Sequence, residues 1–142
     1  MSEYDALKLD NQLCFPLYAA ARKVTSKYTP YFKPLGITYT QYIVFLCLWE
    51  KDNVTVGDLC ERLYLDSGTL TPLLKKMEKN GWLTRKRSSE DERVVVISLT
   101  DAGWALRDKC KDIPAQIGQC VKLEPDEARI LYQTLYKLIR QL

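Results

Sequence analysis

Hydrophobic residues recur at spacings of three and four along most of the chain, which predicts a mainly helical protein. The first apolar face consists of Leu13, Leu17, Ala20, Val24, Tyr28 and Tyr31. Pro30 and Pro34 should close this helix, because proline lacks the backbone N–H that a helix interior uses. Residues 42–49, "YIVFLCLW", are apolar on all sides and predict a buried central helix, with Thr38 and Gln41 as the capping box before it.

Two shorter helices should follow the central one. The inward positions of the first, in "TVGDLCERLYL", are Val56, Leu59, Cys60 and Leu63. The second lies in "LDSGTLTPLLKKMEKNGW", with Asp66 or Ser67 as its N-cap and Asn80-Gly81 as a left-handed C-cap. Pro72 is compatible with this helix only in its first turn.

Beyond residue 81 the pattern changes to the alternation that is typical of strands. "WLTRKR" and residues 94–99 flank the polar segment "SSEDER", which predicts a hairpin with a long tip. Thr100 should then cap a long helix that Pro114 kinks. The apolar side of that helix is Leu106, Cys110, Ile113 and Ile117. Pro125 begins the last helix, whose apolar stripe is Ala128, Leu131, Leu135, Leu138 and Leu142.

A pair of helices, a third helix of the recognition type and a hairpin in direct succession predict a winged helix-turn-helix. The expected fold is mainly α with a small β-hairpin wing, in a single domain of residues 1–142. Residues 36–99 would form the DNA-binding region. Residues 1–35 and 100–142 would be dimerisation helices, because so small a wing domain leaves their apolar faces uncovered. These faces should meet those of a second subunit about a two-fold axis.

Composition excludes several classes of protein and of functional site. Of 142 residues, 46% are apolar and 27% charged, as in ordinary globular domains. No apolar run reaches the ~20 residues of a membrane helix, and "MSEYDALK" lacks the layout of a signal peptide, so we expect a cytoplasmic protein without a membrane partner. The five cysteines are then expected to be thiols. Histidine is absent, which removes most zinc sites and imidazole chemistry, and we expect no metal and no other cofactor.

Basic residues concentrate where the recognition helix and the wing are predicted, although the net charge is only +3. Between residues 75 and 87, six cations stand against Glu78 alone, and such clustering is typical of phosphate binding. Small polar residues begin the same helix, at the end that recognition helices present to base edges. Arg93 on the wing can enter a minor groove while Asp91 holds its guanidinium. The predicted DNA-binding residues are Ser67, Gly68, Thr69, Thr71, Lys75, Lys76, Arg85, Lys86, Arg87, Asp91 and Arg93.

Cys14 admits two interpretations from its surroundings, "LDNQLCFPLYAA". A free cysteine in an apolar helix is usually a small buried hydrophobe. Alternatively, the helix begins at about Phe15 with Pro16 in its first turn, and Cys14 stands at the helix cap, where the dipole and free N–H groups stabilise a thiolate. A kink at Pro16 is the other arrangement of this segment. Of the remaining cysteines, Cys47 and Cys60 fit positions in the core, and Cys110 fits a packed position at an interface.

Longer segments resemble a known family. "LDSGTLTPLLKKMEKNGWLTRKRSSEDERVVVISLTDAG", with D-x-R at Asp91 and Arg93 and "ISLT" at residues 97–100, resembles the multiple-antibiotic-resistance (MarR) regulators. Within that family, "LDNQLCFPLYAA", "TSKYTPYFKPLGITYTQY" and "LDSGTLTPLLKKME" resemble the organic hydroperoxide resistance (OhrR-like) regulators. The resemblance runs from about Leu7 to the end and weakens after Pro114. It implies a homodimeric repressor that leaves a pseudo-palindromic operator in double-stranded DNA when an organic hydroperoxide oxidises one cysteine.

The resemblance implies that Cys14 is the redox-sensing cysteine. It assigns the thiolate hydrogen bonds to Tyr28 and Tyr39 of the same subunit and to Tyr18 of the other subunit. Pro16 departs from the family pattern, which has a small or apolar helix former there. Some members carry a resolving cysteine near the C-terminus of the partner chain, and Cys120 matches it. Other fates of oxidised Cys14 are a mixed disulfide with a low-molecular-weight thiol and a sulfenamide.

Apolar residues around the thiol would favour a bulky organic hydroperoxide over hydrogen peroxide, and the expected neighbours are Leu13, Phe15 and Phe45. We expect no enzymatic activity. The alternatives are a MarR-type repressor released by a small aromatic ligand or another oxidant, and a thiol peroxidase. The peroxidase is disfavoured because the chain has no compact peroxidase-like motif with an arginine near Cys14, and its basic residues are concentrated at the wing.

Overall fold

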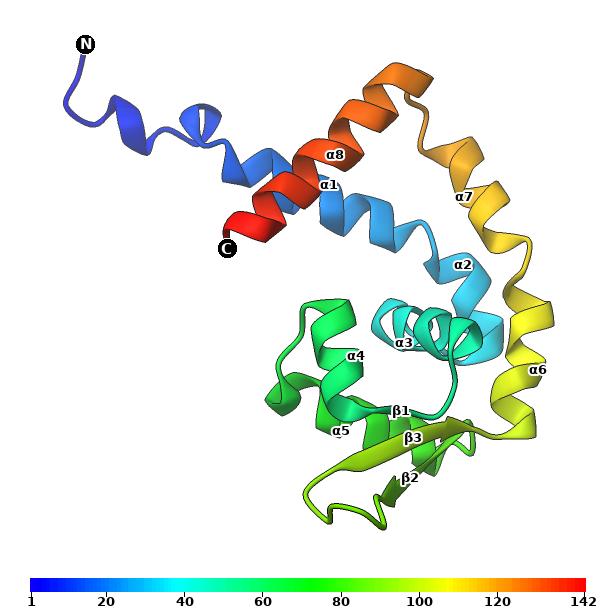
Figure 1. Cartoon of the computed structure of the whole chain (residues 1–142). Coiled ribbons are helices and arrows are strands. Elements are labelled where there is room, and N and C mark those ends of the chain that lie inside the picture. The colour runs from blue at the N-terminus through cyan, green and yellow to red at the C-terminus, as the bar shows by residue number, and fades with distance from the viewer.

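The computed structural model describes all 142 residues of the chain. Figure 1 shows a winged-helix body at one end of the molecule, with long helices extending from it. The N-terminal arm makes two 3-10 turns, η1 (Asp5–Leu7) and η2 (Leu9–Asn11), and leads into α1 (Cys14–Ser26). Two further turns, α2 (Thr29–Phe32) and η3 (Lys33–Leu35), join α1 to the body.

Three helices and three strands form the body. They are α3 (Tyr39–Glu50), β1 (Val54–Thr55), α4 (Val56–Leu63), α5 (Ser67–Lys79), β2 (Leu83–Arg87) and β3 (Val95–Leu99). The strands make an antiparallel sheet in the order β1-β3-β2, in which Val54 pairs with Ile97 and Leu83 with Leu99. The predicted fold, mainly α with a β-hairpin wing, is confirmed. The sequence pattern does not predict β1, because two residues are too few for an alternation to be recognised.

Side chains and one glycine set the ends of the body helices. The predicted capping box of α3 is present: Gln41 N donates to Thr38 Oγ1 (3.3 Å), and Thr38 N donates to Gln41 Oε1 (3.0 Å). Asp66, one of the two candidates, is the N-cap of α5, and its Oδ1 accepts from Thr69 N at 2.7 Å. Gly81 follows α5 with φ of 83°, a left-handed conformation that glycine adopts without strain.

Two prolines lie at positions that differ from the predictions. Helix α1 ends at Ser26, and Pro30 lies in the separate helix α2 instead of closing the first one. Helix α5 begins at Ser67, so Pro72 lies in its second turn rather than its first. The lost backbone hydrogen bond is tolerated because packing holds this helix, whose buried residues are Leu70, Leu74 and Met77.

Three helices follow the wing: α6 (Asp101–Cys110), α7 (Ile113–Cys120) and α8 (Pro125–Gln141). Thr100 caps α6 as predicted, because its hydroxyl accepts from Gly103 N. The predicted kink at Pro114 is wrong, since the chain makes two separate helices there. The apolar side predicted for this segment is nevertheless buried, and it consists of Leu106, Cys110, Ile113 and Ile117. Cys110 therefore belongs to the core of its own chain rather than to an interface.

The core joins the body helices to the sheet and to α6. Phe45 of α3, Leu74 of α5 and Ile97 of β3 have no exposed surface. The indole of Trp49 donates a hydrogen bond to the carbonyl oxygen of Gly103 at 3.0 Å. This contact fixes the start of α6 against α3 of the winged-helix body.

Helices α1 and α8 contain no buried residue in the single chain. The exposed fraction is 42% for Leu17 on α1, and 56% for Ile130 and 47% for Leu131 on α8. Apolar faces left open in this way are typical of protein–protein interfaces. They support the expectation that residues 1–35 and 100–142 mediate dimerisation, and that division of the chain stays a prediction.

Candidate nucleic-acid interface and thiol site

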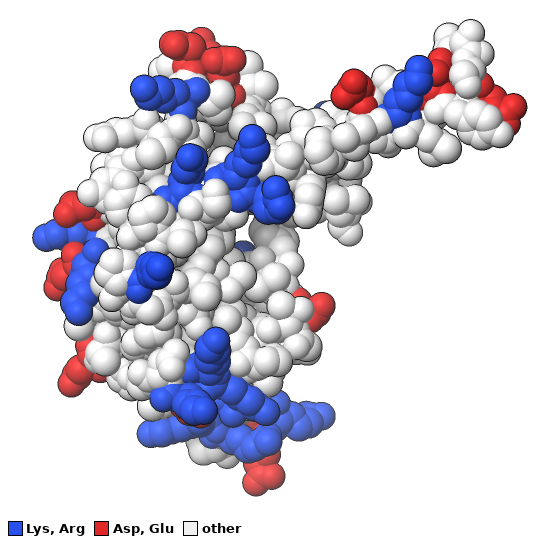
Figure 2. All heavy atoms as spheres, turned by 180° about the vertical axis from the view of Figure 1, so that it is seen from behind, with Lys and Arg blue, Asp and Glu red and all other residues white.

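The first turn of α5 carries the small polar residues that the sequence assigns to DNA. Ser67, Gly68 and Thr69 are exposed, and Thr71 is half-buried one turn further on. Figure 2 shows Lys and Arg side chains gathered at the end of the molecule where the hairpin and α5 lie in Figure 1. We call the cations of α5 and the hairpin the basic surface, and they are Lys75, Lys76, Lys79, Arg85, Lys86, Arg87 and Arg93.

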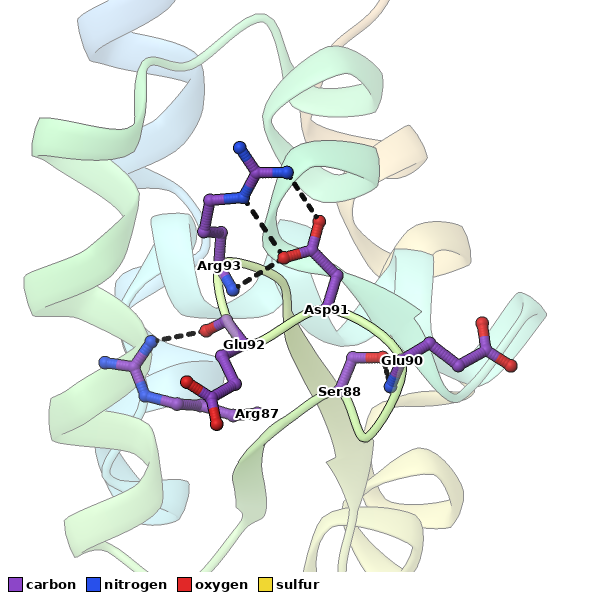
Figure 3. Close-up of polar contacts among 6 residues, drawn as sticks. All are labelled: Arg87, Ser88, Glu90, Asp91, Glu92 and Arg93. Carbon is purple, nitrogen blue, oxygen red and sulfur yellow. Dashed lines mark hydrogen bonds and ion pairs between the residues drawn. The ribbon is translucent and has the colours of Figure 1, made fainter.

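At the tip of the wing, Asp91 holds Arg93 as predicted (Figure 3). Arg93 Nε lies 3.1 Å from Asp91 Oδ1 and Nη2 lies 3.2 Å from Oδ2, while Arg93 N donates to Oδ1 at 3.0 Å. These hydrogen bonds from Arg93 lower the pKa of the Asp91 carboxyl. The side chain of Arg93 is 91% exposed, so the guanidinium stands out from the protein. Arg87 also fixes the tip, because its Nη1 donates to the carbonyl oxygen of Glu92 at 2.7 Å.

Arg85 differs from the other cations of the basic surface because most of its side chain is buried. It lies two residues after the buried Leu83, on the face of β2 that packs against α5. Glu78 of α5 accepts a hydrogen bond from Arg85 N at 2.7 Å, and its other oxygen lies 3.5 Å from Arg85 Nε. Sequence reasoning missed Glu78 as a functional candidate. Its partner Arg85 lies on strand β2, beyond the turn that follows α5, so no helical spacing connects the two residues.

Cys14 is the first residue of α1, and it is exposed. The helix begins one residue before Phe15 and runs unbroken to Ser26, with Pro16 in its first turn. Cys14 therefore lies inside the first turn and not at a cap before it, and Pro16 does not interrupt the helix. No side chain caps the first N–H groups of α1, so these backbone donors are free at the end of the helix that carries Cys14.

Tyr28 follows the C-terminal end of α1, opposite Cys14, and Tyr39 begins α3; their ring centroids lie 5.0 Å apart. Burial raises the pKa of both phenols, so at neutral pH they are protonated and able to donate hydrogen bonds. From Cys14 to Ser26 alone, helix α1 rises by about 18 Å. The prediction that these tyrosines serve the Cys14 of the same subunit is therefore wrong.

Tyr18 lies four residues after Cys14, so the two side chains share one side of α1. The exposed fraction of Tyr18 is 61%, and the guanidinium of Arg22 lies 5.7 Å from the centroid of its ring. Tyr18 thus lies on the same side of α1 as the Cys14 of its own chain, whereas its predicted role was to reach the Cys14 of the other subunit.

Two other expected members of the thiol site lie elsewhere in this chain. Phe45 is fully buried in the core of the body, so its prediction as an apolar neighbour of Cys14 is wrong, whereas Leu13 and Phe15 adjoin Cys14 and are exposed. Cys120 is the exposed last residue of α7, and the fold does not bring it to the Cys14 of the same chain (Figure 1).

A groove of about 430 Å³ opens beside the tyrosine pair, at the far end of α1 from Cys14. Apolar side chains line it next to Tyr39, and these are Phe32 and Ile37. Hydroxyls of Thr25 and Ser26 and the guanidinium of Arg22 supply its polar side. The groove therefore combines apolar side chains with a single tyrosine, Tyr39, and with polar residues, which suits a small, partly apolar group.

A model of the transcriptional regulator family SarA/Rot matches residues 26–110. The organic hydroperoxide resistance transcriptional regulator of Bacillus subtilis is 50% identical over 99% of this chain and 96% of its own length. The chain belongs to the MarR-like SarA/Rot family of regulators. The resemblance to MarR-type and OhrR-like regulators is confirmed.

Two solved structures of another regulator, AbfR of Staphylococcus epidermidis, are also similar to this SarA/Rot-family chain. Reduced AbfR bound to DNA has a TM-score of 0.80 at 34% identity, covering 98% of this chain and 96% of that one. Disulfide-formed AbfR has a TM-score of 0.67 at 37% identity, covering 96% of each chain. These relatives are transcriptional regulators, and no enzyme family is indicated.

Two kinds of feature are absent from the structure. No helix is both long enough and apolar enough to cross a membrane. No three histidine, cysteine, aspartate or glutamate side chains lie together in a way that would hold a metal ion.

Proposed function

We propose that this SarA/Rot-family regulator is a dimeric repressor that releases its operator when an organic hydroperoxide oxidises Cys14. The observation that carries the proposal is an exposed thiol in the first turn of α1, in a chain that is 50% identical to the organic hydroperoxide regulator of B. subtilis. Reduced AbfR bound to DNA supports the DNA-binding half of the proposal.

Operator binding places α5 in a major groove and the wing tip in the adjacent minor groove. The first turn of α5 approaches base edges, the basic surface contacts phosphates, and Asp91 orients Arg93 for the minor groove. A two-fold dimer then requires operator half-sites about 34 Å apart, or a multiple of that distance.

The tyrosines complete the thiol site across the dimer. Cys14 has Tyr18 of its own chain beside it, and the partner's Tyr28 and the partner's Tyr39 supply hydrogen bonds to the thiolate. These phenols stabilise the anion without adding a charge that must itself be buried. The thiolate attacks the distal peroxide oxygen, the O–O bond breaks, and a sulfenic acid forms. The alkoxide leaves and takes up a proton to become an alcohol.

A second step converts this small change into release of DNA. The thiolate of the partner's Cys120 attacks the sulfenic sulfur, a disulfide forms, and the hydroxide that leaves becomes water. An intersubunit disulfide pulls the long helices together and moves the two α5 helices out of register with the half-sites. The disulfide form of AbfR supports such a state. The protein acts stoichiometrically in the cytoplasm, as a sensor rather than an enzyme.

The test is fluorescence anisotropy on a fragment of the protein's own promoter, titrated with cumene hydroperoxide. We expect about one equivalent per subunit to release the wild type, and Cys14→Ser to stay bound. Cys60→Ser is the matched control, because Cys60 is half-buried in the body and should leave release unchanged. If Cys14→Ser is released as well, the peroxide mechanism is wrong and the groove beside Tyr39 becomes the candidate ligand site. A covalent dimer on a non-reducing gel that Cys120→Ser lacks would identify the disulfide.

A further inference from the structure

We propose that Glu78 is a positioning residue for operator binding. Its carboxylate holds Arg85 so that the amino groups of the guanidinium face a DNA phosphate in the cavity between α4, α5 and the wing. This inference rests on the proposed function, because the phosphate is that of bound DNA.

Arg85 is held from two directions. Glu78 Oε2 accepts from the backbone N–H of Arg85 at 2.7 Å, and Glu78 Oε1 lies 3.5 Å from Nε of its side chain. The side chain of Arg85 is only 22% exposed, whereas that of Arg93 is 91% exposed. A cation withdrawn from water in this way needs a charged partner, and Glu78 is the carboxylate that the structure places there. Arg85 therefore starts from a fixed position, unlike the exposed lysines of the basic surface.

The outer half of the same guanidinium has no protein partner. No hydrogen bond from Nη1 or Nη2 of Arg85 to a protein acceptor is present, and the buried Nε lacks a well-aligned acceptor. Arg85 lines a cavity of about 420 Å³, together with Arg93 and the hydroxyl-bearing residues Thr55, Ser67 and Thr71. Two arginines and three hydroxyl-bearing residues around one concave space fit a phosphate group, whose oxygens match the planar fork of an arginine.

The cavity lies where DNA would pass. Its walls come from the first turn of α5, the N-terminal end of α4 around Gly57, and the wing strands at Val95. These elements are the ones that enter or flank the grooves in the proposed complex. The phosphate backbone beside α5 would therefore lie opposite Arg85.

Simple electrostatics makes the opposite prediction for Glu78. An acidic side chain beside the basic surface repels DNA, so its removal should strengthen binding and steepen the dependence on salt. A positioning role requires that the removal of Glu78 weakens binding instead. The two roles therefore differ in the sign of a single measurement.

The experiment compares wild type, Glu78→Gln, Arg85→Ala and the double variant by anisotropy on the promoter fragment, with reduced protein, at two salt concentrations. In Glu78→Gln the amide oxygen can still accept from Arg85 N, so we expect the body to stay folded. Thermal unfolding of the variant checks this. Glu92→Gln is the matched control, because it removes the same charge from an exposed side chain at the wing tip. Higher salt screens the long-range attraction of DNA to the added net positive charge. The effect of losing the Arg85 contact is then easier to measure.

We expect Arg85→Ala to bind roughly tenfold more weakly, as for a lost hydrogen bond to a charged group. The slope of its plot of log K against log salt concentration should be smaller in magnitude by about one, because one phosphate contact fewer releases counterions. Glu78→Gln should bind several-fold more weakly although it is the more cationic protein. When Arg85 is absent, the same substitution should no longer weaken binding. Glu92→Gln should bind equally or more tightly.

The inference is overturned if Glu78→Gln binds as tightly as wild type or more tightly, or if its loss persists without Arg85. If the wild type itself does not prefer the promoter fragment to unrelated DNA, the proposed function fails, and that result is separate from any comparison among variants.

Discussion

Tyr42 is a buried phenol at the centre of the aromatic cluster, 4.9 Å from the ring of Phe32 and 5.8 Å from that of Tyr28. Burial, assisted by its neighbours, raises the pKa of Tyr42 to about 12. The unfolded chain releases this proton near pH 10 and the folded chain near pH 12, so the contribution to stability is present below pH 10. It is lost as the pH rises through that interval, by about 2–3 kcal/mol.

Urea unfolding between pH 9 and pH 12 measures this loss. We expect the free energy of unfolding of wild type to fall more steeply with pH than that of Tyr42→Phe, which has no proton to release there. Tyr4→Phe is the control, because Tyr4 is 64% exposed and should leave the slope unchanged. Equal slopes for wild type and Tyr42→Phe would show that Tyr42 ionises normally in the folded protein.

At the scale of elements, the junction between α6 and the sheet depends on a glycine. A Cβ atom on Gly103 would overlap the carbonyl oxygen of Trp82 and lie 2.9 Å from Cδ2 of Leu99. We expect Gly103→Ala to lower the free energy of unfolding by about 1–3 kcal/mol, since the backbone of another element must move. Gly57→Ala in α4 meets only a 3.6 Å contact and should be neutral or slightly stabilising. Urea unfolding of both variants measures these two effects. An unchanged free energy of unfolding for Gly103→Ala would contradict the close packing of α6.

At the scale of the whole molecule, the proposed function assigns the thiol site to residues of two chains. A mixed dimer with Cys14→Ser in one chain and Tyr28→Phe plus Tyr39→Phe in the other retains one Cys14, which faces intact tyrosines across the dimer. We expect this thiol to react with cumene hydroperoxide at the wild-type rate. The homodimer of the Tyr28→Phe, Tyr39→Phe chain should react roughly tenfold or more slowly, because its thiolates lose hydrogen bonds.

The matched control places all three substitutions in one chain and pairs it with wild type. Its remaining Cys14 then faces phenylalanines across the dimer, although its own tyrosines are intact, and should react slowly. If stopped-flow rates are slow in the first mixed dimer and fast in the second, Tyr28 and Tyr39 act on the Cys14 of their own chain instead.

Much of the fold is predictable because its signals are local. Thr38 and Gln41 are three residues apart, and Thr100 bonds Gly103 at the same separation, so the capping of α3 and α6 is readable from a short window. The D-x-R of the wing is equally local, because Asp91 and Arg93 are two residues apart. Strand β1 is not readable in this way, since Val54 gains its partner Ile97 from the far side of two helices and a hairpin.

The sequence by itself determined the winged-helix class and the recognition helix with its basic surface, because both depend on residue type and short spacing. Its resemblance to OhrR-like regulators indicated Cys14 as the candidate sensor. Only the tertiary structure decided which tyrosines can reach which thiol, since the length of α1 separates Cys14 from Tyr28 within one chain. It also decided that Arg85 is held by Glu78, a contact that exists only because β2 packs back onto α5. Periodicity shows that a face is apolar, whereas packing decides what that face meets.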